Sequence, residues 1–255
     1  MTRSGIPSSI VPSSIMLHAL ELAAFESWPS LEQETHAGWL LRFAKGYTKR
    51  ANSANALHNA SALSEDIEEM ERRFRARDLP PTFRLTSDPA SQAADEQLVL
   101  RGYRLLDPSY VMCLPLTAPR SEIDIVLLDD LDAWLAAFRD ISGKTGAGQG
   151  IHRQILQHIT HPRSLAVCCE AGLPVSCGLG VLVDGHLGLF DLATRLGYQR
   201  RGLATRLCQG LMHWGRDAGA TTAYLQVFAS NIAAIRLYER LGFRQLYHYW
   251  YRIKA

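Results

Sequence analysis

Alternating and helically spaced apolar residues divide the first half of the chain into short strands and amphipathic helices. Serine, proline and isoleucine are mixed over residues 1–12, which predicts a loose arm. Lys45 and Gly46 predict a turn, and Ser64 predicts the capped start of a helix. The predicted elements of this half are a helix over residues 12–28, strands over 38–43 and 47–51, a helix over 64–77, a strand over 81–87, a helix over 90–101 and a strand over 110–116.

The second half shows the same two periodicities and ends in an aromatic run. Its predicted elements are a first strand near residue 123, helices over 131–141 and 151–159, strands over 165–170, 175–183 and 187–194, a helix over 202–218, a strand that stops at Asn231, a helix that carries Tyr238 and a last strand. On that last strand we expect Tyr247, Tyr249 and Tyr251 on one face and Trp250 on the other, since side chains alternate along a strand.

Part of the first half recurs in the second half. The segment from Phe83 runs strand, helix, RGYR and strand, and the segment from Tyr224 runs strand, helix, LGFR and strand. An amphipathic helix precedes each segment. The match favours a duplication, and we expect two domains, residues 1–118 and 119–255, with a linker over residues 117–119.

Composition and charge narrow the classes of partner. The 255 residues carry a formal net charge of +2, because 25 acidic residues nearly balance 27 basic ones, and a nucleic-acid partner is not expected. We find no secretory leader and no apolar run long enough for a membrane span, which predicts a cytoplasmic protein without a membrane partner. The five cysteines include the neighbours Cys168 and Cys169, a pattern typical of reduced, buried thiols.

The segment GYQRRGLATRL turns a predicted strand into a helix and has the chemistry of an anion site. Gly202 and Ala204 allow close approach of a ligand to the backbone, and the free N–H groups of a helix start favour an anion. Arg200 and Arg201 add two positive charges. The equivalent segment of the first half, ANSANALHNASALS, has neither glycine nor an arginine pair. Phosphate is therefore expected in the second copy alone.

Two patterns in the second half resemble those of the GCN5-related N-acetyltransferase (GNAT) superfamily. Gln199, Gly202 and Ala204 match its pyrophosphate loop, Q/R-x-x-G-x-G/A. A later helix matches N-x-x-A-x-x-x-Y-x-x-x-G-F at Asn231, Ala234, Tyr238, Gly242 and Phe243. The resemblance covers residues 123–253. It implies an α+β fold, a mixed and mostly antiparallel twisted sheet flanked by helices, preceded by a partial, degenerate domain of the same kind.

The resemblance also implies a cofactor site and a reaction. Tyr238 would protonate the departing thiolate of coenzyme A, after direct attack of a primary amine on the thioester of acetyl-CoA in a ternary complex. A backbone N–H near residue 194 would polarise the thioester carbonyl. The residues that would contact acetyl-CoA are Leu192, Ala193 and Thr194 along the pantetheine arm, Gln199, Arg200, Arg201, Gly202, Leu203, Ala204 and Thr205 around the pyrophosphate, and Asn231, Ala234 and Tyr238.

The sequence departs from its apparent relatives at the general base. Gln226 stands where ribosomal-protein alanine acetyltransferases have a glutamate, and the position of the histone acetyltransferase base falls near Gly188. Asp191 is the candidate base, although strict alternation turns it away from the face that its role requires unless a bulge or a water relay intervenes. Glu34, His36 or another residue of the first half is the alternative.

Other motifs predict no chemistry of their own. The SGKT segment at residues 142–145 follows a helix, unlike a phosphate-binding P-loop, and is expected to be a loop. His152, His158 and His161 lack metal-site spacing, so we expect solvated or capping histidines and no metal. Because the usual acidic base is missing, a catalytically silent CoA-binding or regulatory protein is the alternative function. The acceptor, a small-molecule or peptide amine, and the oligomeric state are left open.

Overall fold

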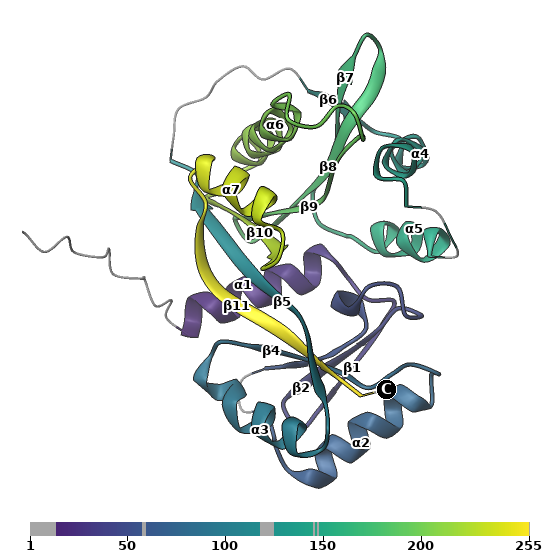
Figure 1. Cartoon of the computed structure of the whole chain (residues 1–255), viewed down its shortest axis with the longest axis vertical. Helices are drawn as coiled ribbons and strands as arrows, with labels where there is room; N and C mark the ends of the chain where they lie inside the picture. Colours follow the sequence, from purple (N-terminus) through teal and green to yellow (C-terminus); the bar gives the residue numbers. More distant parts are fainter. Residues whose placement is uncertain (1–13, 58–59, 118–124, 145, 147, 255) are drawn as a thin grey trace, which may run out of the picture.

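The alternating segments assemble into one continuous sheet of eleven strands in the order β1-β2-β3-β4-β11-β5-β10-β9-β8-β7-β6 (Figure 1). The computed structural model describes residues 14–57, 60–117, 125–144, 146 and 148–254. The predicted arm, and most of the predicted linker, lie outside these residues. The strands are β1 Glu32–His36, β2 Trp39–Phe43, β3 Ala54–Ala56, β4 Thr82–Thr86, β5 Arg104–Pro115, β6 Val126–Leu128, β7 Arg163–Glu170, β8 Leu173–Val183, β9 His186–Thr194, β10 Thr222–Phe228 and β11 Arg244–Ile253.

Strand pairing confirms the predicted fold class. All neighbouring strands described pair antiparallel except β3 with β4 and β9 with β10, which are parallel. The predicted domain boundary at residue 118 does not divide the sheet. Strand β5 of the first half lies between β10 and β11 of the second half, and β11 also pairs with β4. The last strand of each half, β5 or β11, therefore pairs with strands of the other half at the centre of the sheet. The division into domains of residues 1–118 and 119–255 stays a prediction.

Helices cover both faces of the sheet and create three apolar clusters. The first cluster joins α1, α4 and α5 to one face of the sheet. The second joins α6 and α7 to β5 and to strands of the second half, and the third joins α2 and α3 mainly to strands of the first half. Tyr247, Tyr249 and Tyr251 belong to the first cluster and Trp250 packs against the third, as predicted. The helices are α1 Ser14–Ser27, α2 Ser64–Arg75, α3 Gln92–Leu100, α4 Leu131–Ser142, α5 Gln149–Gln157, α6 Leu203–Asp217 and α7 Ile232–Arg240, with short 3-10 turns at Lys49–Ala51 and Pro89–Ser91.

The first hairpin differs from its prediction. Lys45 and Gly46 do turn the chain, with φ of 49° and 79°, but the next residues lead into the 3-10 turn Lys49–Ala51 and the predicted strand over residues 47–51 is wrong. The hairpin joins β1 to β2 instead. The β1 sequence, EQETH, has no apolar residue to signal a strand, because β1 lies at an edge of the sheet with its side chains largely in water.

Two expectations drawn from composition concern thiols and membranes. All five cysteines are free thiols, and four of them are buried. Burial raises the pKa of the Cys113 thiol to about 12, so that thiol is neutral and unreactive at physiological pH. Among the residues that the structure describes, no helix has the length and apolar character that a bilayer crossing needs.

Helix α1 is tied to the centre of the sheet by a buried ion pair. Glu21 accepts hydrogen bonds from the Arg84 guanidinium and from the Tyr247 hydroxyl, and all three side chains are buried. Burial alone would lower the pKa of Arg84. The attraction of the Glu21 carboxylate and its hydrogen bonds have the larger effect, so the pKa of Arg84 is raised. Glu21 therefore connects α1 to β4 through Arg84 and to β11 through Tyr247.

Replacing Glu21 by alanine is expected to lower the free energy of unfolding by about 3–5 kcal/mol, because Arg84 is left charged and unpaired in the interior. Urea denaturation of the purified protein measures the change. The exposed pair between Arg153 and Asp132 offers the matched control, and Asp132→Asn is expected to leave the midpoint of unfolding close to that of the wild type. Equal midpoints for Glu21→Ala and the wild type would contradict this role of the buried pair.

Candidate functional site

Strands β9 and β10 separate partway along their length and leave one edge of β9 open. Their parallel pairing begins at Thr222 with His186 and ends at Leu225 with Leu189. Beyond that point β10 continues beside β5, and the last residues of β9 pair only with β8 in the described sheet. The edge at Leu192, Ala193 and Thr194 therefore faces the opening between the two strands. An extended ligand can add to this edge as a further strand does.

The loop between β9 and α6 has three residues in the left-handed backbone conformation. Gly197, Arg200 and Gly202 all have positive φ, of 87°, 62° and 79°. Turns of this kind direct successive N–H groups toward one point and make an anion site. Gly202 is the N-cap of α6, and it has no side chain to satisfy the first N–H groups of that helix. The open N–H groups and the positive end of the α6 dipole point the same way.

The predicted phosphate residues all lie at this loop and the start of α6. Gln199, Arg200, Arg201 and Gly202 are exposed, and the buried Leu203 anchors the helix start in the second cluster. The remaining two, Ala204 and Thr205, are half-buried in the first turn. Arg201 is held in place: it donates a hydrogen bond to the Gly197 carbonyl at 3.0 Å, lies 3.3 Å from Glu170 and covers the ring of Tyr198. Among the residues that the structure describes, the Arg200 guanidinium makes no comparable hydrogen bond or ion pair.

Helix α7 begins where β10 ends. Asn231 is its N-cap, and the Asn231 side chain accepts a hydrogen bond from the N–H of Ala234 at 3.2 Å. Two turns later Tyr238 is half-buried against α6 and stacks edge-on with Phe243. Burial, with Cys208 nearby, raises the pKa of the Tyr238 hydroxyl, which therefore stays protonated across the physiological range.

Asp191 sits on a bulge in β9. Leu179 of β8 pairs with Phe190, and Cys177 pairs with Ala193, so that two residues of β9 oppose one residue of β8. Asp191 itself has a φ of 48°, a conformation that costs energy for a residue with a side chain. The bulge that an Asp191 base requires is therefore present. It turns the carboxylate toward α5, on the face that Phe190 also occupies.

The Asp191 carboxylate is hydrogen-bonded to His152, a residue that the sequence did not single out for chemistry. The Nε2 atom of His152 lies 2.7 Å from Oδ2 of Asp191, and the imidazole is buried. Aromatic rings surround it: Trp28, Tyr47, Trp134 and Phe138 all contact the imidazole. Its position could have been found from spacing, since it shares the apolar face of α5 with Ile155 and Leu156.

The other two histidines of that group lie apart from this pair. His158 faces the Gln154 carbonyl at 2.7 Å and His161 pairs with Glu26 at 2.7 Å, so the expectation of capping or solvated histidines holds for these two and is wrong for the buried His152. Within the part of the chain that the structure describes, no three His, Cys, Asp or Glu side chains come together as a metal site does.

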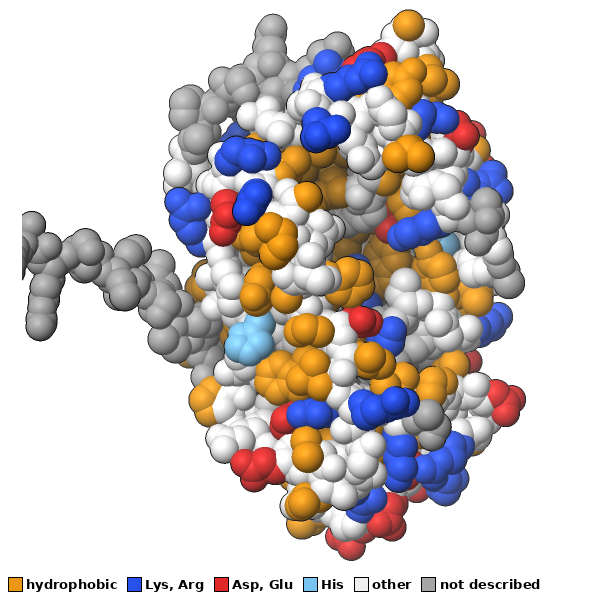
Figure 2. Space-filling model, viewed as in Figure 1, with side chains coloured by type: hydrophobic (Ala, Val, Ile, Leu, Met, Phe, Trp, Pro, Cys, Tyr) orange, Lys and Arg blue, Asp and Glu red, His pale blue; other side chains and the backbone are white. Residues whose placement is uncertain are grey.

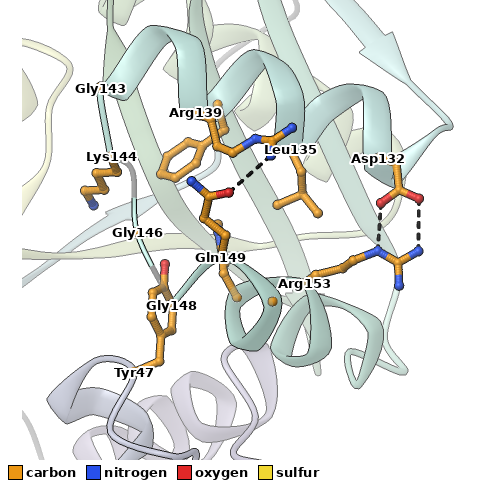
Figure 3. A pocket seen from close by; sticks show the side chains of 13 residues that line it. Tyr47, Asp132, Leu135, Arg139, Gly143, Lys144, Gly146, Gly148, Gln149 and Arg153 are labelled. Carbon is orange, nitrogen blue, oxygen red and sulfur yellow. Dashed lines mark hydrogen bonds and ion pairs between the residues drawn. The ribbon is translucent and has the colours of Figure 1, made fainter.

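Two adjoining cavities lie beside the bulge. The smaller, of about 300 Å³, is lined by Asp191, Leu192, Ala193, Thr194 and Gln199. The larger, of about 850 Å³, lies between α4 and α5 and is closed on one side by Tyr47 of the first half (Figure 3). The residues common to both cavities are Phe138 and Lys144. Asp191 lines the smaller cavity and His152 lines the larger one. The hydrogen-bonded pair of side chains therefore lies between the two cavities.

The SGKT segment takes part in these cavities. Ser142 lines the smaller cavity and Lys144 lines both, while Thr145 lies outside the described residues. Gly143 ends α4 in the left-handed conformation, with a φ of 65°. The segment follows a helix, as the sequence indicated, and it does not have the strand-to-helix setting of a phosphate-binding P-loop.

Other positions considered for the general base are occupied or remote. Glu34 and His36 lie on β1, at the opposite end of the sheet from β9, where Arg73 and Asp66 pair with them. Seven strand intervals separate β1 from β9, about 34 Å at the usual spacing. These two alternatives are therefore wrong. Gln226 accepts a hydrogen bond from the Tyr249 hydroxyl at 3.1 Å, and a side chain at Gly188 would collide with Phe190.

On the face drawn in Figure 2, the positive charge of the described residues is not gathered into one patch. Figure 2 shows lysine and arginine side chains spread over the upper and lower parts of the visible face, among acidic and apolar ones. A continuous basic surface is the electrostatic mark of nucleic-acid binding. The visible face gives no support for such a partner.

Several known proteins are similar to this chain. Residues 128–243 match a model described as the acetyltransferase (GNAT) family, and residues 15–140 match one described as the C-terminal part of a probable histone acetyltransferase, Rv0428c. The chain is 24% identical to the uncharacterized N-acetyltransferase YobR of Bacillus subtilis, covering 93% of this chain and 98% of YobR. It is 29% identical to the probable histone acetyltransferase Rv0428c of Mycobacterium tuberculosis, covering 91% and 72%.

The fold also has solved counterparts. A GCN5-related N-acetyltransferase from Kribbella flavida superimposes with a TM-score of 0.71 over 93% of this chain and 95% of that one, at 15% identity. The shared architecture extends over both halves.

Proposed function

We propose, from the premise that this chain belongs to the GCN5-related N-acetyltransferase superfamily, that it transfers an acetyl group from acetyl-CoA to a primary amine of a small-molecule or peptide acceptor. The observation that carries the proposal is that three features follow one another along the chain and line one opening. They are the bulge at Asp191, the open edge of β9 at Leu192 to Thr194, and the loop before α6 that we assign to phosphate binding. Each of these features matches a different part of acetyl-CoA.

The residues present fit the cofactor. Backbone N–H groups at Arg200 to Gly202 and at the start of α6 suit the pyrophosphate. The edge at Leu192, Ala193 and Thr194 suits the amide groups of the pantetheine arm, which can pair as a strand does. Asn231 and Ala234 stand at the start of α7, shortly after β10 ends, and would contact the cofactor from that side. The acetyl group would then lie in the smaller cavity beside Asp191.

Asp191 is assigned as the general base and Tyr238 as the general acid. The acceptor nitrogen gives a proton to Asp191, directly or through water, and its lone pair forms the new bond to the thioester carbonyl carbon. The carbon–sulfur bond then breaks, and the sulfur leaves with the electron pair and takes a proton from the Tyr238 hydroxyl. His152 is a positioning residue, since its hydrogen bond fixes the Asp191 carboxylate at the junction of the cavities.

Affinity for the cofactor is expected to depend on the arginine pair of the loop. Replacing both Arg200 and Arg201 by glutamine removes two positive charges near the pyrophosphate and is expected to raise the Kd of acetyl-CoA by about 10–100-fold, at about 0.7–1.4 kcal/mol for each of the two contacts. Isothermal titration calorimetry measures this change. Arg240→Gln, an exposed arginine at the other end of α7, is the control and is expected to bind as the wild type does. Unchanged affinity in the double variant would remove the loop from the site.

Release of free thiol from acetyl-CoA, measured against a panel of amines, tests the proposed reaction. We expect turnover that requires an amine and that yields one acetylated amine for each thiol released. Binding of acetyl-CoA without turnover across the panel would favour a catalytically silent CoA-binding protein instead. Binding of ATP or NAD in place of CoA would overturn the assignment of the loop.

A further inference from the structure

One wall of the larger cavity is formed by Tyr47, a residue of the first half of the chain. The side-chain amide of Asn52 donates a hydrogen bond to the Tyr47 carbonyl at 2.8 Å and accepts one from the Ala44 N–H at 2.7 Å, which fixes the loop that carries Tyr47. The Tyr47 ring stacks on His152 with 5.4 Å between ring centres. It also fills the place of a side chain at Gly148, whose Cβ would lie 2.5 Å from the ring. This wall is therefore rigid and apolar.

The cavity continues to the reacting centre through three contacts. The Lys144 ammonium lies 5.5 Å from the centre of the Phe138 ring, Phe138 packs edge-on against His152, and His152 is hydrogen-bonded to Asp191. Lys144 and Asp191 both line the smaller cavity. Lys144 and the proposed base therefore line one cavity and are linked through the rings of Phe138 and His152. A small molecule with an amine and an anionic group can contact both of them.

The cavity carries positive charge that its own acidic residue does not neutralise. Arg153 is bound by both oxygens of Asp132, at 2.7 and 2.9 Å. Arg139, by contrast, donates a hydrogen bond to the neutral amide of Gln149, at 3.1 Å, as Figure 3 shows. Among the described residues, neither Arg139 nor Lys144 has a carboxylate within ion-pair distance. Two cations at the rim of an apolar cavity favour a ligand that brings its own anion.

We propose that the acceptor is a small amine that carries a carboxylate and an apolar body, as an amino acid with an aromatic or branched side chain does. The carboxylate lies between Arg139 and Lys144, the apolar body lies against Tyr47 and Phe138, and the amine faces Asp191. This inference rests on the proposed acetyl transfer, which supplies the acetyl group. The same charges disfavour polyamines and other acceptors that are themselves cationic.

Matched pairs of amines test the assignment. L-phenylalanine and L-leucine are compared with L-phenylalaninamide and L-leucinamide, which replace only the carboxylate by a neutral amide. Spermidine and a short peptide amine complete the panel. We expect kcat/KM for an acid to exceed that for its amide by at least about tenfold, the worth of one charge-assisted contact. The amide has the more readily deprotonated amine, so its chemistry alone would give the opposite order.

Two double variants separate the contribution of the free cations from that of the cavity as a whole. Arg139→Gln with Lys144→Gln is expected to reduce the preference for the acid over the amide to about one. Asp132→Asn with Arg153→Gln removes the neutralised pair from the same cavity without changing its net charge, and is expected to keep the preference. Higher kcat/KM for amides, spermidine or the peptide in the wild type would overturn the proposal.

A binding measurement distinguishes this proposal from the proposed function. Calorimetry with N-acetyl-L-phenylalanine reports on the cavity without any turnover, and its affinity is expected to fall about tenfold or more in the Arg139→Gln, Lys144→Gln variant. Binding of this kind without turnover of any amine would contradict the acetyltransferase and support the carboxylate site. Turnover of other amines with no binding of N-acetyl-L-phenylalanine would do the reverse.

Discussion

Replacing Tyr238 by phenylalanine is expected to lower kcat for acetyl transfer by about 10²–10⁴-fold, the usual effect of losing a general acid. The variant keeps the ring that packs against Phe243 and α6, so the fold and the affinity for acetyl-CoA should be close to those of the wild type. Stopped assays of thiol release give kcat, and calorimetry gives the affinity. A loss in kcat without a loss in binding identifies a group that acts on the leaving thiolate.

The pH dependence of the wild type bears on the same residue. Because burial raises the pKa of Tyr238, the hydroxyl stays protonated well beyond pH 10, and ionisation of Tyr238 is not expected to reduce kcat at alkaline pH. The matched control is Tyr110→Phe, which removes a hydroxyl from another half-buried tyrosine of the same apolar cluster and is expected to leave kcat unchanged. Equal kcat for Tyr238→Phe and Tyr110→Phe would remove the acid assignment.

Replacing Asp191 by asparagine is expected to lower kcat/KM for the amine by about 10²–10⁴-fold at neutral pH, because the asparagine cannot accept the proton that the attacking nitrogen must lose. The amide has nearly the size of the carboxylate, so the bulge and the contact with His152 can be retained. Part of the lost activity should return as the pH rises toward the pKa of the acceptor amine, since free amine then becomes available without the base.

His152 needs a separate variant because its role is positional. His152→Gln keeps a hydrogen-bonding group near Asp191 and is expected to reduce kcat/KM by about tenfold, with the pH profile displaced from that of the wild type. A purely structural role for His152 would lower stability and leave the pH profile in place.

A wild-type rate in the Asp191→Asn variant at neutral pH would exclude Asp191 as the base.

Much of the fold could be predicted because several long elements, α4 and α6 among them, keep a clear apolar periodicity. α6 and β9 carry such patterns and were placed to within a residue or two. The edge strand β1 is all polar and gave no such signal. The exchange of β5 and β11 between the halves depends on contacts between segments far apart in the chain, which no local pattern encodes.

The candidate site divides in the same way. The loop between β9 and α6 and the α7 motif are each a short run of neighbouring residues, so residue types and spacing identify both segments. That they hold acetyl-CoA stays a prediction. The pairing of Asp191 with His152 joins residues 39 positions apart across a bulge, and strand alternation predicts neither the bulge nor the contact. Tyr47 reaches the larger cavity because the 3-10 turn replaces the expected strand at residues 47–51.

Mass spectrometry of the reaction mixture tests the proposed transfer most directly. The wild-type protein is incubated with acetyl-CoA and the amine panel, and acetylated amine and free CoA are quantified together. We predict an acetylated amine in a one-to-one ratio with CoA, formed far more slowly by Tyr238→Phe and Asp191→Asn. Saturable binding of acetyl-CoA with no acetylated amine from any member of the panel would contradict the assignment of this protein as an acetyltransferase.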